Sequence, residues 1–134
     1  MNFLSINVQG FGKLPKHKWV RDLCLKNCIN FLSLKETKIT LLDLSLIRSV
    51  WGNSYFDFAS SSATGMSGGI LCVWECGIKR VLLKKRTFSM DSFVVIKGLW
   101  VPLNINLMVI FVYAPQDPTA WRELWSRFVE FVAN

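Results

Sequence analysis

Apolar and polar residues follow two different periodicities along the chain, and these predict short strands interspersed with helices. Apolar runs, or alternation with a period of two, predict strands over residues 3–8, 29–35, 54–59, 69–74, 80–88, 93–100 and 105–113. Apolar residues spaced three and four apart predict helices over residues 16–28, 41–50 and 118–132. Several hairpins mixed with helices favour α+β layers over a regular parallel repeat, in one module that covers residues 1–134.

The predicted helices carry recognisable boundary signals. Thr40 is expected to cap the second helix, with Asp43 as a weak capping-box partner, and Asp117 followed by Pro118 starts the third. Helical spacing places one set of residues on the apolar face of the first helix: Trp19, Val20, Leu23, Cys24 and Cys28. The only histidine, His17, is expected on the opposite, basic face as a surface residue.

Composition and charge narrow the class of protein. Hydrophobic residues make up 51% of the chain and charged residues 19%, which excludes a disordered protein and suggests apolar surface for a partner or further segment to cover. Sixteen Lys and Arg against nine Asp and Glu give a net charge of +7, which favours a polyanionic partner. The longest apolar run, residues 107–114, is too short for a membrane helix, and no targeting segment is visible.

Four cysteines form two C-x-x-x-C pairs, Cys24/Cys28 and Cys72/Cys76. The second pair on one strand would lie about 13 Å apart, too far to share a metal ion. All four are therefore expected to be reduced core or near-core residues of an intracellular protein.

Candidate chemistry lies at the ends of the predicted strands, where loops carry function on a rigid scaffold. Four short segments stand out there: Asn7-Val8-Gln9-Gly10, Leu34-Lys35-Glu36-Thr37-Lys38, Ser67-Gly68-Gly69-Ile70-Leu71 and Val112-Tyr113-Ala114-Pro115. Each alone is typical of an ordinary turn or strand end.

Together and in this order, the four segments resemble the endonuclease/exonuclease/phosphatase family. Ser-Gly-Gly-Ile-Leu followed by Trp74, and Leu124-Trp125 soon after Tyr-Ala-Pro, resemble its plant LINE-type (non-LTR) retrotransposon branch. The resemblance covers essentially the whole chain. It implies the N-terminal half of the family domain, a partial four-layer αββα sandwich of the DNase I-like type.

The resemblance also implies roles for particular residues. Glu36 matches the family's carboxylate ligand for Mg²⁺ (or Mn²⁺), Asn7 the asparagine that orients active-site groups, and Tyr113 the tyrosine that contacts the scissile phosphate. Phosphate-binding cations are expected around them, namely Lys13, Lys16, Lys35 and Lys38. Gln9 stands where DNA-repair relatives often carry an aspartate, so metal affinity is expected to be lower.

The family's Gly-Asp-x-Asn and Ser-Asp-His motifs do not occur in the sequence. The expected function is thus a truncated DNA endonuclease, inactive as this chain, whose natural partners are DNA and the missing C-terminal half. No other protein partner is evident, and a retrotransposon enzyme would be nuclear. Three alternatives stay open: a non-catalytic nucleic-acid-binding fragment that also uses Lys84-Lys85-Arg86, a decayed element product without function, and a phosphatase of the same superfamily.

Overall fold

The computed structural model describes residues 2–64, 67–77, 82–90, 92–113 and 117–133. The elements follow the chain in this order: β1 (Phe3–Asn7), α1 (Leu14–Lys26), β2 (Phe31–Lys35), α2 (Leu44–Trp51), β3 (Phe56–Ser61), β4 (Ile70–Glu75), β5 (Leu82–Met90), β6 (Phe93–Trp100), a 3₁₀ turn (Val101–Leu103), β7 (Ile105–Val112) and α3 (Pro118–Ala133). Each predicted strand and helix is present, with ends that shift by a few residues. Of the predicted strand 80–88, the first two residues lie outside the described ranges.

The strands form two sheets. One has four strands in the order β1-β2-β4-β3, and the other has three in the order β5-β6-β7. β1 and β2 are parallel neighbours, while every other pairing is antiparallel. β2 lies between β1 and β4, and its first four residues are buried, Ser33 among them, because both faces of the strand are covered.

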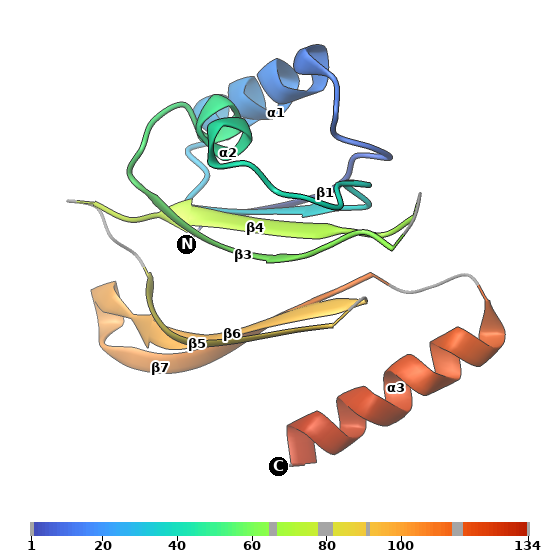
Figure 1. The fold of residues 1–134 in the computed structure, drawn as a ribbon. Helices are drawn as coiled ribbons and strands as arrows, with labels where there is room; N and C mark the ends of the chain where they lie inside the picture. The colour runs from blue at the N-terminus through green and yellow to red at the C-terminus, as the bar shows by residue number, and fades with distance from the viewer. Residues whose placement is uncertain (1, 65–66, 78–81, 91, 114–116, 134) are drawn as a thin grey trace.

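Figure 1 shows how the elements are layered, with α1 and α2 on one face of the four-stranded sheet and the three-stranded sheet against its other face. Alternation along β2 serves both contacts, because Leu32 and Leu34 pack against the helices and Phe31 packs against the second sheet. The Phe31 ring stacks on Trp74 from its own sheet and on Phe111 from the opposite sheet, with ring centroids 5.1 and 5.2 Å apart. A continuous aromatic core therefore joins the two sheets.

α3 lies on the far side of the three-stranded sheet (Figure 1). Leu124 is buried against Phe93 and Val95, and Phe131 packs on the same cluster. Two other apolar side chains of this helix, Trp121 and Trp125, are 45% and 37% exposed. All three predicted helices thus cover outer sheet faces, and α3 retains an exposed apolar side.

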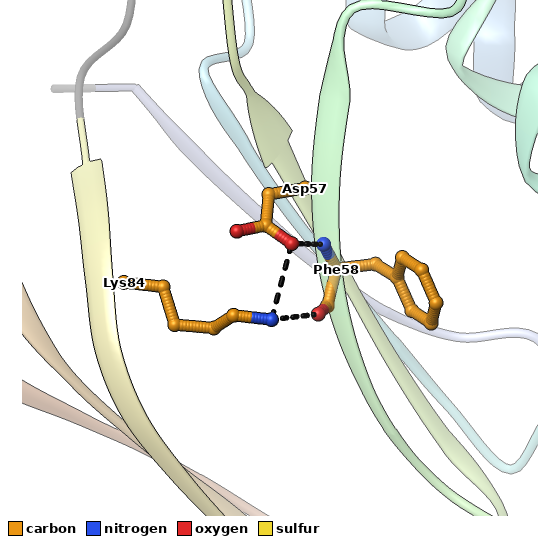
Figure 2. A network of polar contacts seen from close by, with 3 residues as sticks. All are labelled: Asp57, Phe58 and Lys84. Atoms are coloured by element: carbon orange, nitrogen blue, oxygen red, sulfur yellow. Dashed lines mark hydrogen bonds and ion pairs between the residues drawn. The ribbon is translucent and has the colours of Figure 1, made fainter.

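A polar contact also joins the two sheets. Lys84 on β5 reaches Asp57 on β3, with 3.1 Å between the Lys84 Nζ and Asp57 Oδ1 atoms, and donates a hydrogen bond to the Phe58 carbonyl at 3.2 Å (Figure 2). Lys84 was expected to hold phosphates in the nucleic-acid-binding alternative. Its ammonium group is instead engaged within the fold.

Three expectations about the caps and faces of the helices are wrong, in addition to that for His17, which is described with the candidate site. Asp43, not Thr40, is the N-cap of α2, because its carboxylate accepts hydrogen bonds from the backbone N–H and hydroxyl of Ser45. α1 ends at Lys26, so Cys28 lies beyond the helix and is exposed instead of sharing its apolar face. Trp19 is 52% exposed, since the buried face of α1 is centred on Val20 and Cys24.

Candidate functional site at the carboxyl ends of β1, β2 and β7

Asn7 and Lys35 are paired residues at the ends of two parallel strands, and Glu36 follows directly. The Asn7 Oδ1 atom accepts a hydrogen bond from the Gln9 backbone N–H at 3.1 Å, which fixes the turn after β1. Glu36 is half-buried in a left-handed backbone conformation (φ 57°). Within the described residues its carboxylate makes no hydrogen bond or ion pair.

The segment after β1 continues to run beside the segment after β2. Backbone N–H groups of Val8, Gly10 and Phe11 donate to the carbonyls of Lys35, Glu36 and Thr37 at 3.0, 2.7 and 2.9 Å. The two loops are therefore held at a fixed distance beyond the strand ends. This pairing places the Asn7 turn and Glu36 on neighbouring segments that are joined by backbone hydrogen bonds.

Lys16 on α1 stabilises the first of these loops from the other side. Its Nζ atom donates to the carbonyls of Val8, Gln9 and Gly10 at 2.7, 3.2 and 3.0 Å. An ammonium group has three donors, so all of them are used. Lys16 was predicted as a phosphate contact, but the structure gives its ammonium group a role inside the fold.

The Ser-Gly-Gly segment forms the third side of this region. Backbone N–H groups of Thr37 and Lys38 donate to the carbonyls of Gly69 and Gly68 at 3.1 and 2.9 Å. Gly69 has φ +92°, and a Cβ atom there would overlap the Thr37 hydroxyl and lie 3.2 Å from the Lys38 nitrogen. The glycine therefore lets the two loops approach closely enough for two backbone hydrogen bonds to fix the segment that follows Glu36.

Tyr113 lies at the same end of the molecule, although it follows the last strand of the other sheet. Paired positions and one hydrogen bond, Ser61 Oγ to the Met90 carbonyl at 2.6 Å, connect the strand ends in this order: Lys35, Ile70, Ser61, Met90, Phe93 and Val112. Tyr113 comes next, half-buried against the core between the sheets, with its backbone N–H bonded to the Ser92 carbonyl at 2.8 Å. Ala114 and Pro115, which completed the predicted motif, lie outside the described residues.

His17 is not the surface residue that the sequence suggested. It is 7% exposed, its Nε2 atom lies 2.6 Å from the Phe11 carbonyl, and its Nδ1 atom lies 3.3 Å from the Ser49 hydroxyl. Its spacing to Val20 and Cys24 follows the helical period, so its place on the apolar face was available in the sequence. His17 links the loop after β1 to both helices, and burial keeps it from acting as an acid or base toward a substrate.

Of the predicted phosphate contacts, Lys13 and Lys38 are exposed and Lys35 is half-buried. Lys38 also has a left-handed backbone (φ 58°), and its side chain passes beside Gly10. Two of the cations that flank Glu36 in sequence therefore lie at the strand ends that carry Asn7 and Glu36, where they raise the local positive potential.

The oxygen donors here form only part of a metal-binding set. No group of three or more His, Cys, Asp or Glu side chains that could hold a metal ion occurs among the described residues. The Glu36 carboxylate and the amide oxygens of Asn7 and Gln9 have the hard-donor character that Mg²⁺ requires. They fit a site in which water and substrate phosphate supply the remaining ligands.

Comparison with known proteins supports the class of fold. No family model matches the sequence, and no curated protein does. Among solved structures, the chain is similar to an AP endonuclease, LMAP from Leishmania major, with a TM-score of 0.61 and 14% sequence identity. The match covers 84% of this chain and 40% of the AP endonuclease, so this chain spans well under half of that protein. The fold is thus of the DNase I-like kind. Separately, none of the helices in the described ranges has the length and apolar character needed to cross a bilayer.

Proposed function

We propose that this chain is part of a metal-dependent DNA endonuclease domain of the retrotransposon type, and that it lacks a complete catalytic set. The observation that carries the proposal is the location of Asn7, Glu36 and Tyr113 at one end of both sheets. The AP endonuclease-like fold supports a nuclease over other basic domains. The proposed complete architecture is a four-layer αββα sandwich, of which this chain would form about half.

The three residues suit phosphodiester hydrolysis. Glu36 and Asn7 would hold Mg²⁺ or Mn²⁺, which when bound supplies positive charge to the phosphate oxygens. The Tyr113 hydroxyl would donate a hydrogen bond to a phosphate oxygen whose negative charge grows in the transition state. Exposed Lys38 and half-buried Lys35 would attract the backbone of the nucleic acid.

The described residues offer no partner to activate the attacking water. His17 is buried with its Nε2 atom 2.6 Å from the Phe11 carbonyl, and Glu36 is the one carboxylate in the four segments that resemble the family. General acid–base assistance contributes about 10²- to 10⁴-fold in rate. We therefore expect the 134-residue chain to leave plasmid DNA intact in Mg²⁺ or Mn²⁺.

The test joins this chain to the C-terminal half of a related endonuclease, in cis or as a separate chain. Metal-dependent nicking should appear, and Glu36→Ala should abolish it. Glu75→Ala is the matched control. Glu75 is also half-buried at a strand end, but it ends β4, whose first residue, Ile70, is the one that pairs with Lys35 beside Glu36. If the 134-residue chain nicks DNA on its own, and Glu36→Ala abolishes that activity, the proposal that its catalytic site is incomplete is wrong.

A second candidate is a non-catalytic module that binds nucleic acid through its basic surface. The exposed side chains of Lys13 and Lys38 favour it. Both candidates predict weak, sequence-independent DNA binding that falls steeply with salt. They differ in metal dependence: a complemented protein that binds DNA but never nicks it in Mg²⁺ or Mn²⁺ would favour the binding module.

A further inference from the structure

A groove lies between α3 and the outer face of β5 and β6, away from the core between the sheets. It has a volume of about 550 Å³ and opens to solvent. Its floor is made of paired residues on the two strands, with Met90 opposite Phe93, Phe88 opposite Val95, and Arg86 opposite Lys97. The floor is therefore apolar at one end and cationic at the other.

The groove combines aromatic surface with positive charge. Phe88 is 45% exposed, and its ring stacks on Phe131 of α3 at 5.1 Å with an interplanar angle of 20°. The Lys97 ammonium lies 5.5 Å from the centre of the Phe131 ring. Arg127 adds a third cation, paired with Glu123 at 2.9 Å, and Glu130 is the one carboxylate in the lining. Because Glu123 pairs with Arg127, the positive balance of the groove comes from Arg86 and Lys97 against Glu130.

A second hollow extends the groove toward the end of the molecule that carries Tyr113. It measures about 470 Å³ and shares Met90, Phe93 and Arg127 with the first. Phe93 is paired with Val112, the residue before Tyr113. The combined hollow is an elongated track from the strand ends to the Arg86–Lys97 pair, a shape that suits a polymer better than a single small molecule.

We propose that this track binds a single strand of nucleic acid, with a base against Phe88 and phosphates against Arg86 and Lys97. Arg86 and Lys97 lie directly opposite each other on neighbouring strands, so one phosphate group could accept hydrogen bonds from both. Aromatic rings accept any base by stacking, while a basic groove follows the backbone. This role goes beyond the proposed endonuclease site and uses none of its residues.

The experiment measures fluorescence polarisation of a labelled oligothymidylate of about 12 nucleotides with the 134-residue chain. Phe88→Leu keeps an apolar side chain but removes the ring face, and Arg86→Ala removes one cation. Each should weaken binding about tenfold, as expected for the loss of one stacked base or one phosphate contact. Lys85→Ala is the matched control, because Lys85 is on the same strand and bonds to Asn106 outside the groove.

Binding that is unchanged in both groove variants, or that falls as far in Lys85→Ala as in Arg86→Ala, would overturn the proposal. Thymidine monophosphate as competitor separates a strand from a free nucleotide: a strand site requires the oligomer to bind much more tightly than the monomer. An acidic amphipathic peptide that binds where the oligonucleotide does not would assign the track to a protein partner, and so would also overturn it. Circular dichroism of Phe88→Leu checks that the variant is folded.

Discussion

The ammonium group of Lys84 on β5 lies 3.1 Å from the carboxylate of Asp57 on β3, and this ion pair connects the two sheets (Figure 2). The same ammonium donates to the Phe58 carbonyl and lies 5.8 Å from the Trp74 ring. Asp57 also accepts a hydrogen bond from the Phe58 backbone N–H at 2.8 Å. Lys84 therefore satisfies polar groups at the margin of an otherwise apolar interface.

Replacing Lys84 with Met should lower the free energy of unfolding by about 1 kcal/mol, because the long stem is kept while the ion pair and hydrogen bond are lost. Both side chains are about a third exposed (32% and 31%), so solvent screening limits the effect. Urea titration of Lys84→Met against Lys85→Met measures it. Equal losses in the two variants would show that the inter-sheet contact contributes no more than an ordinary surface charge.

Gly69→Ala should destabilise the protein by about 2 kcal/mol or more. The methyl group enters a left-handed conformation and meets Thr37 and Lys38 at the same time. Gly12→Ala is the control, since a Cβ there meets nothing within 4 Å and its φ is not positive. The comparison uses chemical denaturation, and a Gly69→Ala protein as stable as Gly12→Ala would disprove the close approach of the two loops.

Asp43 gives a pH-dependent prediction. The hydrogen bonds from the Ser45 hydroxyl and backbone N–H, together with Arg48, lower the pKa of Asp43. A lowered folded-state pKa means that the capping contribution is fully present above the ordinary Asp pKa and is lost as the pH falls through the folded value. Asp43→Ala should therefore lower the thermal midpoint at neutral pH and make little difference in strong acid.

Asp43→Asn separates the cap from the charge. Asparagine caps helices as well as aspartate but does not titrate, so this variant should keep its midpoint near neutral pH and lose the acid-dependent step. Thermal melts of both variants across the acid range check this. An Asp43→Ala deficit that persists unchanged in strong acid would contradict the cap assigned to Asp43.

The sequence predicted the existence of each strand, because each is marked by an apolar run or by alternation with a period of two, although the ends shift by a few residues. The strand over residues 29–35 was predicted and is present as β2, and β6 was predicted with its observed limits. The cap of α2 was placed at Thr40 because Thr, like Asp, is a good cap, and local sequence does not say which one starts the helix. Asp43 caps it because Leu44 is the first residue in helical conformation.

The sequence predicted the motifs of the candidate site but not the side-chain contacts that Lys16 and His17 make around it. Asn7 and Glu36 could be paired in advance, since consecutive parallel strands commonly lie side by side. The three bonds of Lys16 depend on the angle between α1 and the sheet, which no local pattern encodes. His17 was predicted on the basic face of the helix, although its spacing to Val20 and Cys24 places it on the buried face.

The cysteines should differ widely in reactivity. Burial raises the pKa of Cys24 to about 11 and that of Cys72 to about 12, which leaves almost no thiolate at neutral pH. Cys28 is exposed and should react first with a disulfide reagent in native buffer, while Cys72 should react only after denaturation. The reaction can be followed by the absorbance of the thiol that the reagent releases, and Cys28→Ser should remove the fast phase of this absorbance change. A fast phase that survives this substitution would mean that another thiol is accessible.

Lys16→Met should loosen the loop after β1 without removing a phosphate contact. The substitution leaves the carbonyls of Val8, Gln9 and Gly10 without their shared donor, so the segment that follows Asn7 loses its support from α1. The backbone N–H groups of Gly10 and Phe11, bonded to Glu36 and Thr37, should then exchange with solvent faster. Hydrogen exchange followed by NMR measures this directly.

Lys13→Met is the matched control, because Lys13 is exposed and precedes α1, and its side chain bonds to no described residue. It should leave exchange at Gly10 unchanged and reduce the salt dependence of DNA binding by about one charge. Lys16→Met should do the reverse, since its ammonium donors are already occupied within the protein. A Lys16→Met protein with normal exchange at Gly10 and a reduced salt dependence would restore Lys16 to the phosphate-binding role that the sequence suggested.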